Sequence, residues 1–208
     1  MSAARDEILT LVRSALGDGR PAAPALPAYR RAGTLGARAR VDLFAARVAD
    51  YRAEVLRIGA ARVAEAVEDV AAGRTFGVPP GLPAAWRPAA FVPDDALSLA
   101  DLDRLDGVVT ACTVAIATTG TIVLSGRPEE GRRALTLVPD LHVCIVGGTQ
   151  IVETVPEAFD RLAACATSPL TFVSGPSATS DIELRRVEGV HGPRRLVVLI
   201  VEEEDEGG

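Results

Sequence analysis

The chain has 208 residues, of which 48% are hydrophobic, and this composition supports one packed main domain and excludes wholesale disorder. Its formal net charge of −6 argues against nucleic acid as the main partner, because binding a phosphate backbone needs a basic surface. The sequence has no apolar run near the roughly 20 residues that span a bilayer and no signal-peptide core, so we expect a cytoplasmic protein without a membrane span.

The first part of the chain is predicted to be a helix followed by a linker. Apolar residues repeat at helical spacing over residues 3–16, and Gly17 ends the pattern. The following residues are rich in proline and have no helical period. We therefore divide the chain into an N-terminal helix at 1–16, a Pro/Gly-rich linker at 17–36 and an α/β domain at 37–208. Two interpretations of the helix stay open, namely packing on its own domain and docking onto a partner.

The next segments are predicted to be two helices, a strand and a loop. Apolar residues recur at steps of three and four over 40–58, and Gly59 follows them, so this segment is predicted to be the clearest helix. A weaker helix is predicted over 61–72 and a short strand over 76–78. The proline-rich residues 79–95 predict irregular backbone.

Beyond Gly107 the sequence alternates short apolar runs with turns. The runs predict strands, which lie at 107–113, 122–124, 141–146, 170–173 and 196–201. Those at 170–173 and 196–201 are expected to be buried. A helix that begins with proline is predicted over 156–165, and residues 126–133 are predicted to form an exposed charged turn. Together the elements predict an α/β layered domain with a mostly parallel or mixed central sheet.

Cysteine and histidine are sparse. Cys112, Cys144 and Cys165 are far apart in sequence and contain no C-x-x-C pair, so we expect no iron–sulfur cluster of the protein's own. Cys112 and Cys144 lie in apolar runs, where a free thiol usually packs as a small hydrophobe. His142 begins a predicted buried strand and is assigned a structural role. Two separated histidines do not predict a metal site.

Two polar loops are candidates for binding an anion. In Thr119-Gly120-Thr121, glycine lets backbone N–H groups converge and the threonines add hydroxyls, although the tripeptide alone favours a plain tight turn over an anion site. The second loop follows the end of the predicted strand at 170–173, where α/β sheets usually bind ligands, and its polar density favours binding over a simple helix start. Its candidate ligand-binding residues are Ser174, Gly175, Ser177, Thr179, Glu183 and Gly192. We expect the two loops to face one pocket.

His191 is the candidate general acid or base. It lies before Gly192-Pro193, and Asp181 or Glu183 is placed to orient it, so His191 and Asp181 form the candidate catalytic couple. A histidine that only satisfies its own loop is the commoner case, and composition alone favours that interpretation. Five arginines, at 127, 132, 133, 185 and 186, are assigned mainly to a solvated face, from which one could clamp a carboxylate.

The ordered motifs Ala115-Ile116-Ala117-Thr118-Thr119-Gly120-Thr121, Ser174-Gly175-Pro176-Ser177, Asp181-Ile182-Glu183 and Gly189-Val190-His191-Gly192-Pro193 resemble the LUD domain family, in its lactate utilization protein C branch. The resemblance covers about residues 41–202. It implies a NagB/RpiA/CoA-transferase-like fold and work with iron–sulfur subunits that oxidise L-lactate to pyruvate, in which the partners hold the clusters. Two positions depart from the family pattern. Thr118 replaces a frequent acidic residue, and Ala178 replaces a frequent arginine that could clamp an anion.

Three functions follow from these observations. The first is a non-cluster subunit of a lactate-oxidising iron–sulfur assembly, with a pocket for a small anion or a cofactor fragment. The second is a stand-alone enzyme on an anionic substrate such as a sugar phosphate or an acyl-CoA. The third is a regulatory or scaffold domain. The sequence favours the first.

Overall fold

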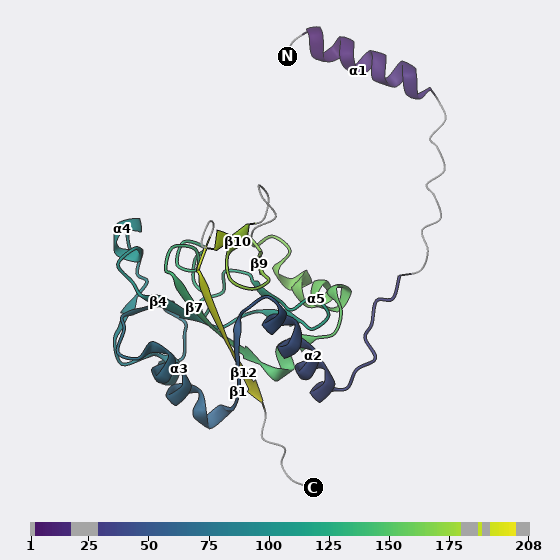
Figure 1. Ribbon diagram of the computed structural model, residues 1–208. Helices are drawn as coiled ribbons and strands as arrows, with labels where there is room; N and C mark the ends of the chain where they lie inside the picture. The colour runs from purple at the N-terminus through teal and green to yellow at the C-terminus, as the bar shows by residue number, and fades with distance from the viewer. Residues whose placement is uncertain (1–2, 18–28, 180–186, 189–191, 203–208) are drawn as a thin grey trace. The chain divides into compact units, whose positions relative to one another are not determined.

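The computed structural model describes residues 3–17, 29–179, 187–188 and 192–202 (Figure 1). The chain divides into two compact units, Met1–Arg30 and Arg31–Gly208. In the first unit, α1 spans Ala3–Leu16, as the apolar spacing predicts. None of the described helices is long and apolar enough to cross a membrane.

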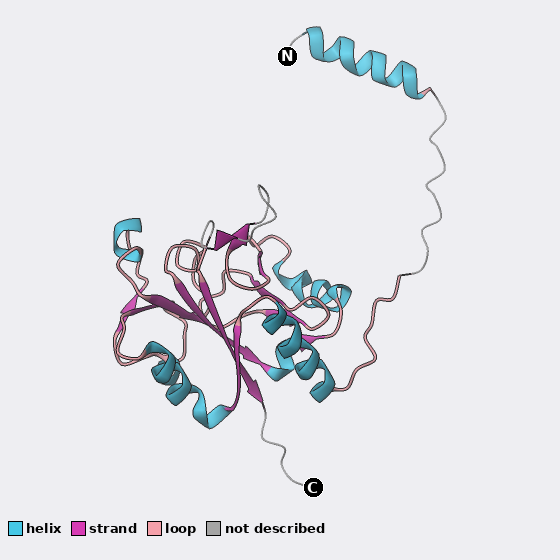
Figure 2. Cartoon of the chain, viewed as in Figure 1, coloured by secondary structure: helices cyan, strands magenta, loops and turns pink. Residues whose placement is uncertain are grey.

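The second unit is built on a six-stranded parallel sheet (Figure 2). Its strands are, in spatial order, β1 (Glu54–Gly59), β12 (Arg195–Glu202), β7 (Leu141–Gly147), β4 (Gly107–Thr110), β2 (Phe76–Val78) and β3 (Phe91–Pro93). The continuous apolar runs of β7 and β12 are buried on both faces, as strands of parallel sheets usually are. The predicted α/β fold with a mostly parallel central sheet is therefore confirmed.

Alternate residues of β7 and β12 face two different layers. Val197 and Leu199 point to the face covered by α3 (Val63–Ala71), where Val63 and Val67 are buried. The opposite face packs against α2 (Ala37–Asp50) and a second sheet. Each face thereby gains the apolar cover that a parallel sheet needs.

The second sheet has four strands in the order β8 (Ile151–Val152), β5 (Val114–Ile116), β6 (Thr121–Leu124) and β9 (Thr171–Val173). Strands β5 and β6 form a hairpin around Thr118–Gly120. The outer side of this sheet packs on α5 (Val155–Leu162), which begins where Thr154 and Glu157 form a capping box. The short helix α4 spans Leu99–Leu102, and β10 (Ala178–Thr179) pairs with β11 (Val187–Glu188).

Residues 31–36 are fastened to the main unit. The backbone N–H groups of Thr34 and Leu35 donate to the carboxylate of Glu153 over 2.5 and 2.6 Å, and that of Gly33 donates to Glu157 over 3.1 Å. Glu153 is buried. Charge-assisted hydrogen bonds of this kind are roughly twice as strong as neutral ones, so they fix the entry into α2.

Four expectations were wrong. Residues 79–95 are not wholly irregular, because Phe91–Pro93 forms β3 and pairs with β2 in the parallel sheet. The segment 40–58 is not one helix, because α2 ends at Asp50, Arg52 takes a left-handed φ of 66°, and Glu54–Gly59 pairs with β12 as a strand. The turn at 126–133 is not wholly exposed, since Glu130 is buried and accepts from the backbone N–H groups of Ser125 and Arg127 over 2.6 and 3.1 Å. Strand β9 is only half-buried, because it forms an edge of the second sheet.

Candidate functional site

A pocket of about 230 Å³ lies beside the second polar loop. Its lining includes Ser174, Gly175 and Ser177 from that loop, and Gly192. The backbone N–H of Ser177 donates to the carbonyl of Pro193 over 2.8 Å, which ties the two sides of the pocket together. Four of the predicted ligand-binding residues therefore line one cavity.

The location of the pocket differs from the expected one. Ser174 follows β9, which belongs to the four-stranded sheet, whereas His142 and Leu196 line the pocket from the amino ends of β7 and β12. Ligands of open parallel sheets usually bind at the carboxyl ends of the strands. That rule does not explain the position of this pocket, because the loop follows a strand of the four-stranded mixed sheet and not of the parallel sheet.

The Thr119-Gly120-Thr121 turn meets the second loop through hydroxyl groups. Thr119 Oγ1 donates to Thr121 Oγ1 over 2.8 Å, and the hydroxyls of Thr121 and Ser174 are also 2.8 Å apart. The turn is not among the described residues that line the pocket. Its threonine hydroxyls therefore serve the contact between the loops, and Ser174 belongs to both the contact and the pocket.

Close packing explains the glycines of both loops. Gly120 has φ of +60°, and a Cβ there would lie 2.8 Å from the carbonyl carbon of Arg47 and 2.9 Å from the nitrogen of Val48. Gly175 has φ of +85°, and its Cβ would lie 2.5 Å from the Cβ of Tyr51. Both loops are pressed against the C-terminal end of α2, where only glycine fits.

Arg133 supplies positive charge to the pocket. Its guanidinium donates to the carbonyl and the hydroxyl of Thr136, both over 3.2 Å, and partial burial lowers its pKa. No ion pair between described residues involves Arg133, whereas the neighbouring Arg132 is bound by both carboxylate oxygens of Asp94 at 2.8 Å. Of the arginines at 127, 132 and 133, which the structure describes, Arg133 is the one that lines the cavity.

His142 supplies a neutral polar group at the same wall. It is buried, its Nε2 lies 2.8 Å from Thr110 Oγ1, and burial together with the nearby charge of Arg133 lowers its pKa to about 4. At neutral pH the imidazole is therefore uncharged. Sequence reasoning gave His142 a purely structural role, because its strand pattern carries no sign of the pocket beside it.

The remaining predicted residues are only partly described. His191, Asp181 and Glu183 lie outside the described residues, and Thr179 is described only as part of the backbone of β10. The proposed catalytic couple of His191 and Asp181 stays a prediction.

Two cysteines lie close together behind the hairpin. Cys112 and Cys144 are buried and free, and the neighbouring Cys144 together with burial raises the pKa of Cys112 well above its ordinary value. Cys144 Sγ lies 3.8 Å from the carbonyl of Ala111, and Cys112 Sγ lies 3.7 Å from Gln150 Oε1. Within the described part of the chain, no group of three or more His, Cys, Asp or Glu residues could hold a metal ion.

Comparison with known proteins places the chain among relatives. Residues 98–201 match the LUD domain. The lactate utilization protein C of Deinococcus radiodurans is 45% identical over 204 residues, which cover 95% of each chain. The lactate utilization protein C of Bacillus pumilus is 36% identical over 95 residues, or 43% of this chain and 39% of the relative.

A solved structure supports the same grouping. The crystal structure of a DUF162 family protein from Deinococcus radiodurans superposes with a TM-score of 0.72 at 39% identity, and the match covers 81% of this chain and 99% of that one. The full-length identity of 45% and the matched domain agree with the ordered motifs of the two loops. The chain belongs to the LUD domain family.

Proposed function

We propose that this protein is a non-cluster subunit of a lactate-utilization system and that the pocket beside Ser174 and Ser177 binds a small carboxylate, such as L-lactate or pyruvate. The names of the relatives support the first part, since they are lactate utilization proteins. Proteins that carry iron–sulfur clusters are the partners proposed for the oxidation itself.

The observation that supports the pocket is the guanidinium of Arg133. It lies at the wall of a small cavity, and no carboxylate among the described residues pairs with it. A planar guanidinium binds carboxylates through two parallel hydrogen bonds, which makes arginine the usual residue for this task. The cavity, at about 230 Å³, is below the roughly 300 Å³ at which pockets for drug-sized ligands begin, so it suits a three-carbon acid.

The other lining groups suit a hydroxy acid or a keto acid. Ser177 contributes a serine side chain to the lining, and the neutral His142 adds polarity without a second charge. A cationic imidazole would instead bring two positive charges to a ligand that carries one negative charge. His191 and Asp181 stay the proposed proton-transfer groups, on the grounds of their sequence motif.

Thermal denaturation with L-lactate, pyruvate and acetate tests the pocket. A ligand at about 100 times its dissociation constant stabilises the protein by roughly 2.7 kcal/mol, or about 5–11 °C for a chain of this size. Arg133→Gln should abolish the shift, and Ser177→Ala should reduce it. Arg127→Gln is the control. It removes a charge from the turn that precedes Arg133, where the side chain pairs with Glu129, and it should leave the shift intact.

Co-expression with iron–sulfur proteins tests the assembly. The tagged chain should retain a cluster-bearing partner, identified by its absorption spectrum, through affinity purification. Recovery of the chain alone would contradict the role as a subunit. Turnover by the isolated protein that disappears in His191→Ala would support the stand-alone enzyme instead.

A further inference from the structure

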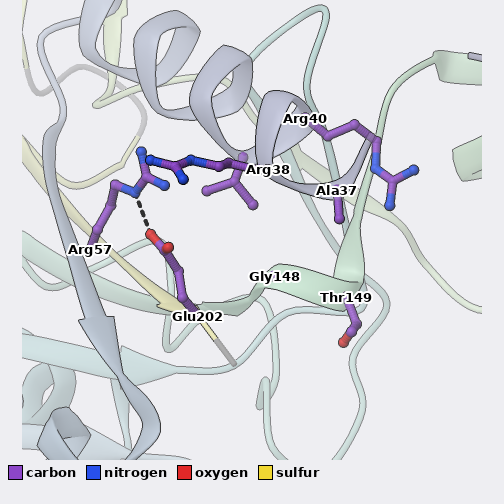
Figure 3. Close-up of a pocket in the computed structure, with 8 residues that line it drawn as sticks. Ala37, Arg38, Arg40, Arg57, Gly148, Thr149 and Glu202 are labelled. Carbon is purple, nitrogen blue, oxygen red and sulfur yellow. Dashed lines mark hydrogen bonds and ion pairs between the residues drawn. The ribbon is translucent and has the colours of Figure 1, made fainter. Parts of the chain in front are cut away.

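A second pocket lies at the carboxyl ends of the parallel strands, whereas the pocket beside Ser174 lies at their amino ends. It is larger, with a volume of about 390 Å³ (Figure 3). Arg57 reaches it from β1, Glu202 from the end of β12, and Gly148 and Thr149 follow directly after β7. The remaining lining residues, including Arg38 and Arg40, come from the first turn of α2 and the residue after it. This is the carboxyl edge of the sheet, where α/β folds usually bind ligands.

Three guanidinium groups and one carboxylate line this pocket. Arg57 is already neutralised, because it donates to Glu202 and, over 2.5 Å, to Asp42, and these hydrogen bonds raise its pKa. No hydrogen bond or ion pair between described residues involves the side chain of Arg38. In a protein with a net charge of −6, this excess of cations around one cavity is a local reversal of charge.

Arg40 has donors without an acceptor. Its Nε is buried and has no hydrogen-bond partner among the described residues, and its NH1 makes only a long contact of 3.4 Å with the carbonyl of Leu35. Figure 3 shows Arg38 extending toward Arg57 and Arg40 on the other side, above Thr149. The NH2 of Arg40 makes no hydrogen bond to a described residue either, and Arg40 lines the pocket, so an anion there could accept from the guanidinium.

The start of α2 adds to the same field. Its N-cap is Gly36, which provides no side-chain hydrogen bond, and its first turn contains no acidic residue. The free N–H groups and the helix dipole therefore present partial positive charge that no acidic side chain of the first turn offsets.

We propose that this pocket binds the phosphate groups of a small phosphorylated ligand, with Arg38 and Arg40 as the residues that hold them. Two unpaired guanidiniums suit a group that carries more than one negative charge, and phosphate oxygens match the guanidinium fork. The volume falls within the range of about 300–1,000 Å³ typical of small-molecule sites. This site is separate from the carboxylate pocket beside Ser174, and its occupant would be a second ligand of the protein.

Calorimetric titration of the full chain with inorganic pyrophosphate and with inorganic phosphate, at low ionic strength, tests this site. We expect saturable binding, tighter for pyrophosphate. Arg38→Gln and Arg40→Gln should each weaken it about tenfold or more, because each removes a charge-assisted hydrogen bond. Arg47→Gln is the matched control, since it removes one charge from the other end of α2, where the side chain pairs with Asp50. It should bind like the wild type.

The outcomes separate the two pockets. Arg38→Gln should leave stabilisation by L-lactate unchanged. Failure of phosphate binding would therefore not contradict the carboxylate pocket, and failure of L-lactate binding would not contradict the phosphate site. The proposal is overturned if neither probe binds at millimolar concentration, if Arg47→Gln weakens binding as much as Arg38→Gln, or if only Arg133→Gln abolishes it. Four acidic residues follow Glu202 in the sequence, and the full chain used in every titration contains them. Any binding that is measured therefore occurs in competition with these acids.

Discussion

Replacing Gly120 by alanine tests whether the Thr119-Gly120-Thr121 turn is built for packing or for a ligand. The added Cβ would lie 2.8–2.9 Å from backbone atoms of Arg47 and Val48, and these atoms belong to a helix that is anchored in the core. Gly126 offers a control, because it has a similar φ of +75° and nothing lies within 4 Å of its Cβ position.

The expected cost has two parts. A left-handed φ costs an alanine roughly 1–2 kcal/mol, and both variants carry this part. Overpacking against a fixed neighbour adds about 1–3 kcal/mol, and only Gly120→Ala carries it. For a chain of about 200 residues, 1 kcal/mol shifts the melting temperature by roughly 2–4 °C. Gly126→Ala should therefore melt about 2–8 °C below the wild type, and Gly120→Ala about 4–20 °C below it.

Differential scanning calorimetry on the two variants measures the difference. A clearly larger drop for Gly120→Ala would show that the approach to α2 requires glycine. Equal drops would refute the packing argument and return the turn to the list of candidate anion sites. Titration with L-lactate is a second test. Gly120 does not line the carboxylate pocket, so Gly120→Ala should still bind L-lactate.

Three further predictions concern a buried histidine, the cysteines and a buried carboxylate. His142 has a folded-state pKa of about 4, below the unfolded value near 6.5, so the unfolded state binds more protons in this window and the protein loses stability as the pH decreases. Urea titrations should give a free energy of unfolding about 2 kcal/mol lower at about pH 5 than at about pH 7.5, and His142→Gln should lose that pH dependence. Cys165 is only partly buried, so it should be the single thiol that reacts rapidly with a disulfide reagent under native conditions. Burial protects Cys112 and Cys144, and Cys165→Ser should therefore remove the fast phase. Glu153→Gln should weaken the hold on residues 31–36 and accelerate tryptic cleavage there, while an unchanged cleavage rate would contradict the anchoring role.

The parallel sheet could be predicted from the sequence because its central strands are buried on both faces. The apolar runs of β7 and β12 have no helical alternative of adequate length, and glycine or proline bounds them. Strand β1 was mistaken for the end of a helix because Val55 and Ile58 continue the spacing of α2. Only the left-handed turn at Arg52 separates the two elements, and arginine is not a residue that marks such a turn.

The candidate pockets could be predicted only in part. The density of serine and glycine identified 174–177, because such residues free the backbone for a ligand. Arg133 and His142 come from other segments, and only the packing of β7 against its neighbours brings them to the same wall. No local sequence pattern predicts the pocket lined by Arg38, Arg40 and Arg57. Its arginines are spread over α2 and β1, and every basic residue of this sequence other than histidine is arginine.

The position of β12 has a consequence for how the chain is made. β12 is the last described strand in sequence, yet it lies second in the sheet and is the only strand in that sheet with which β1 pairs. Roughly 140 residues separate β1 from β12, so a ribosome needs on the order of 10 s to make the partner of β1 after β1 itself. During that interval β1 lacks the strand that covers its edge in the folded protein, and an unpaired strand edge is a template for pairing with other chains.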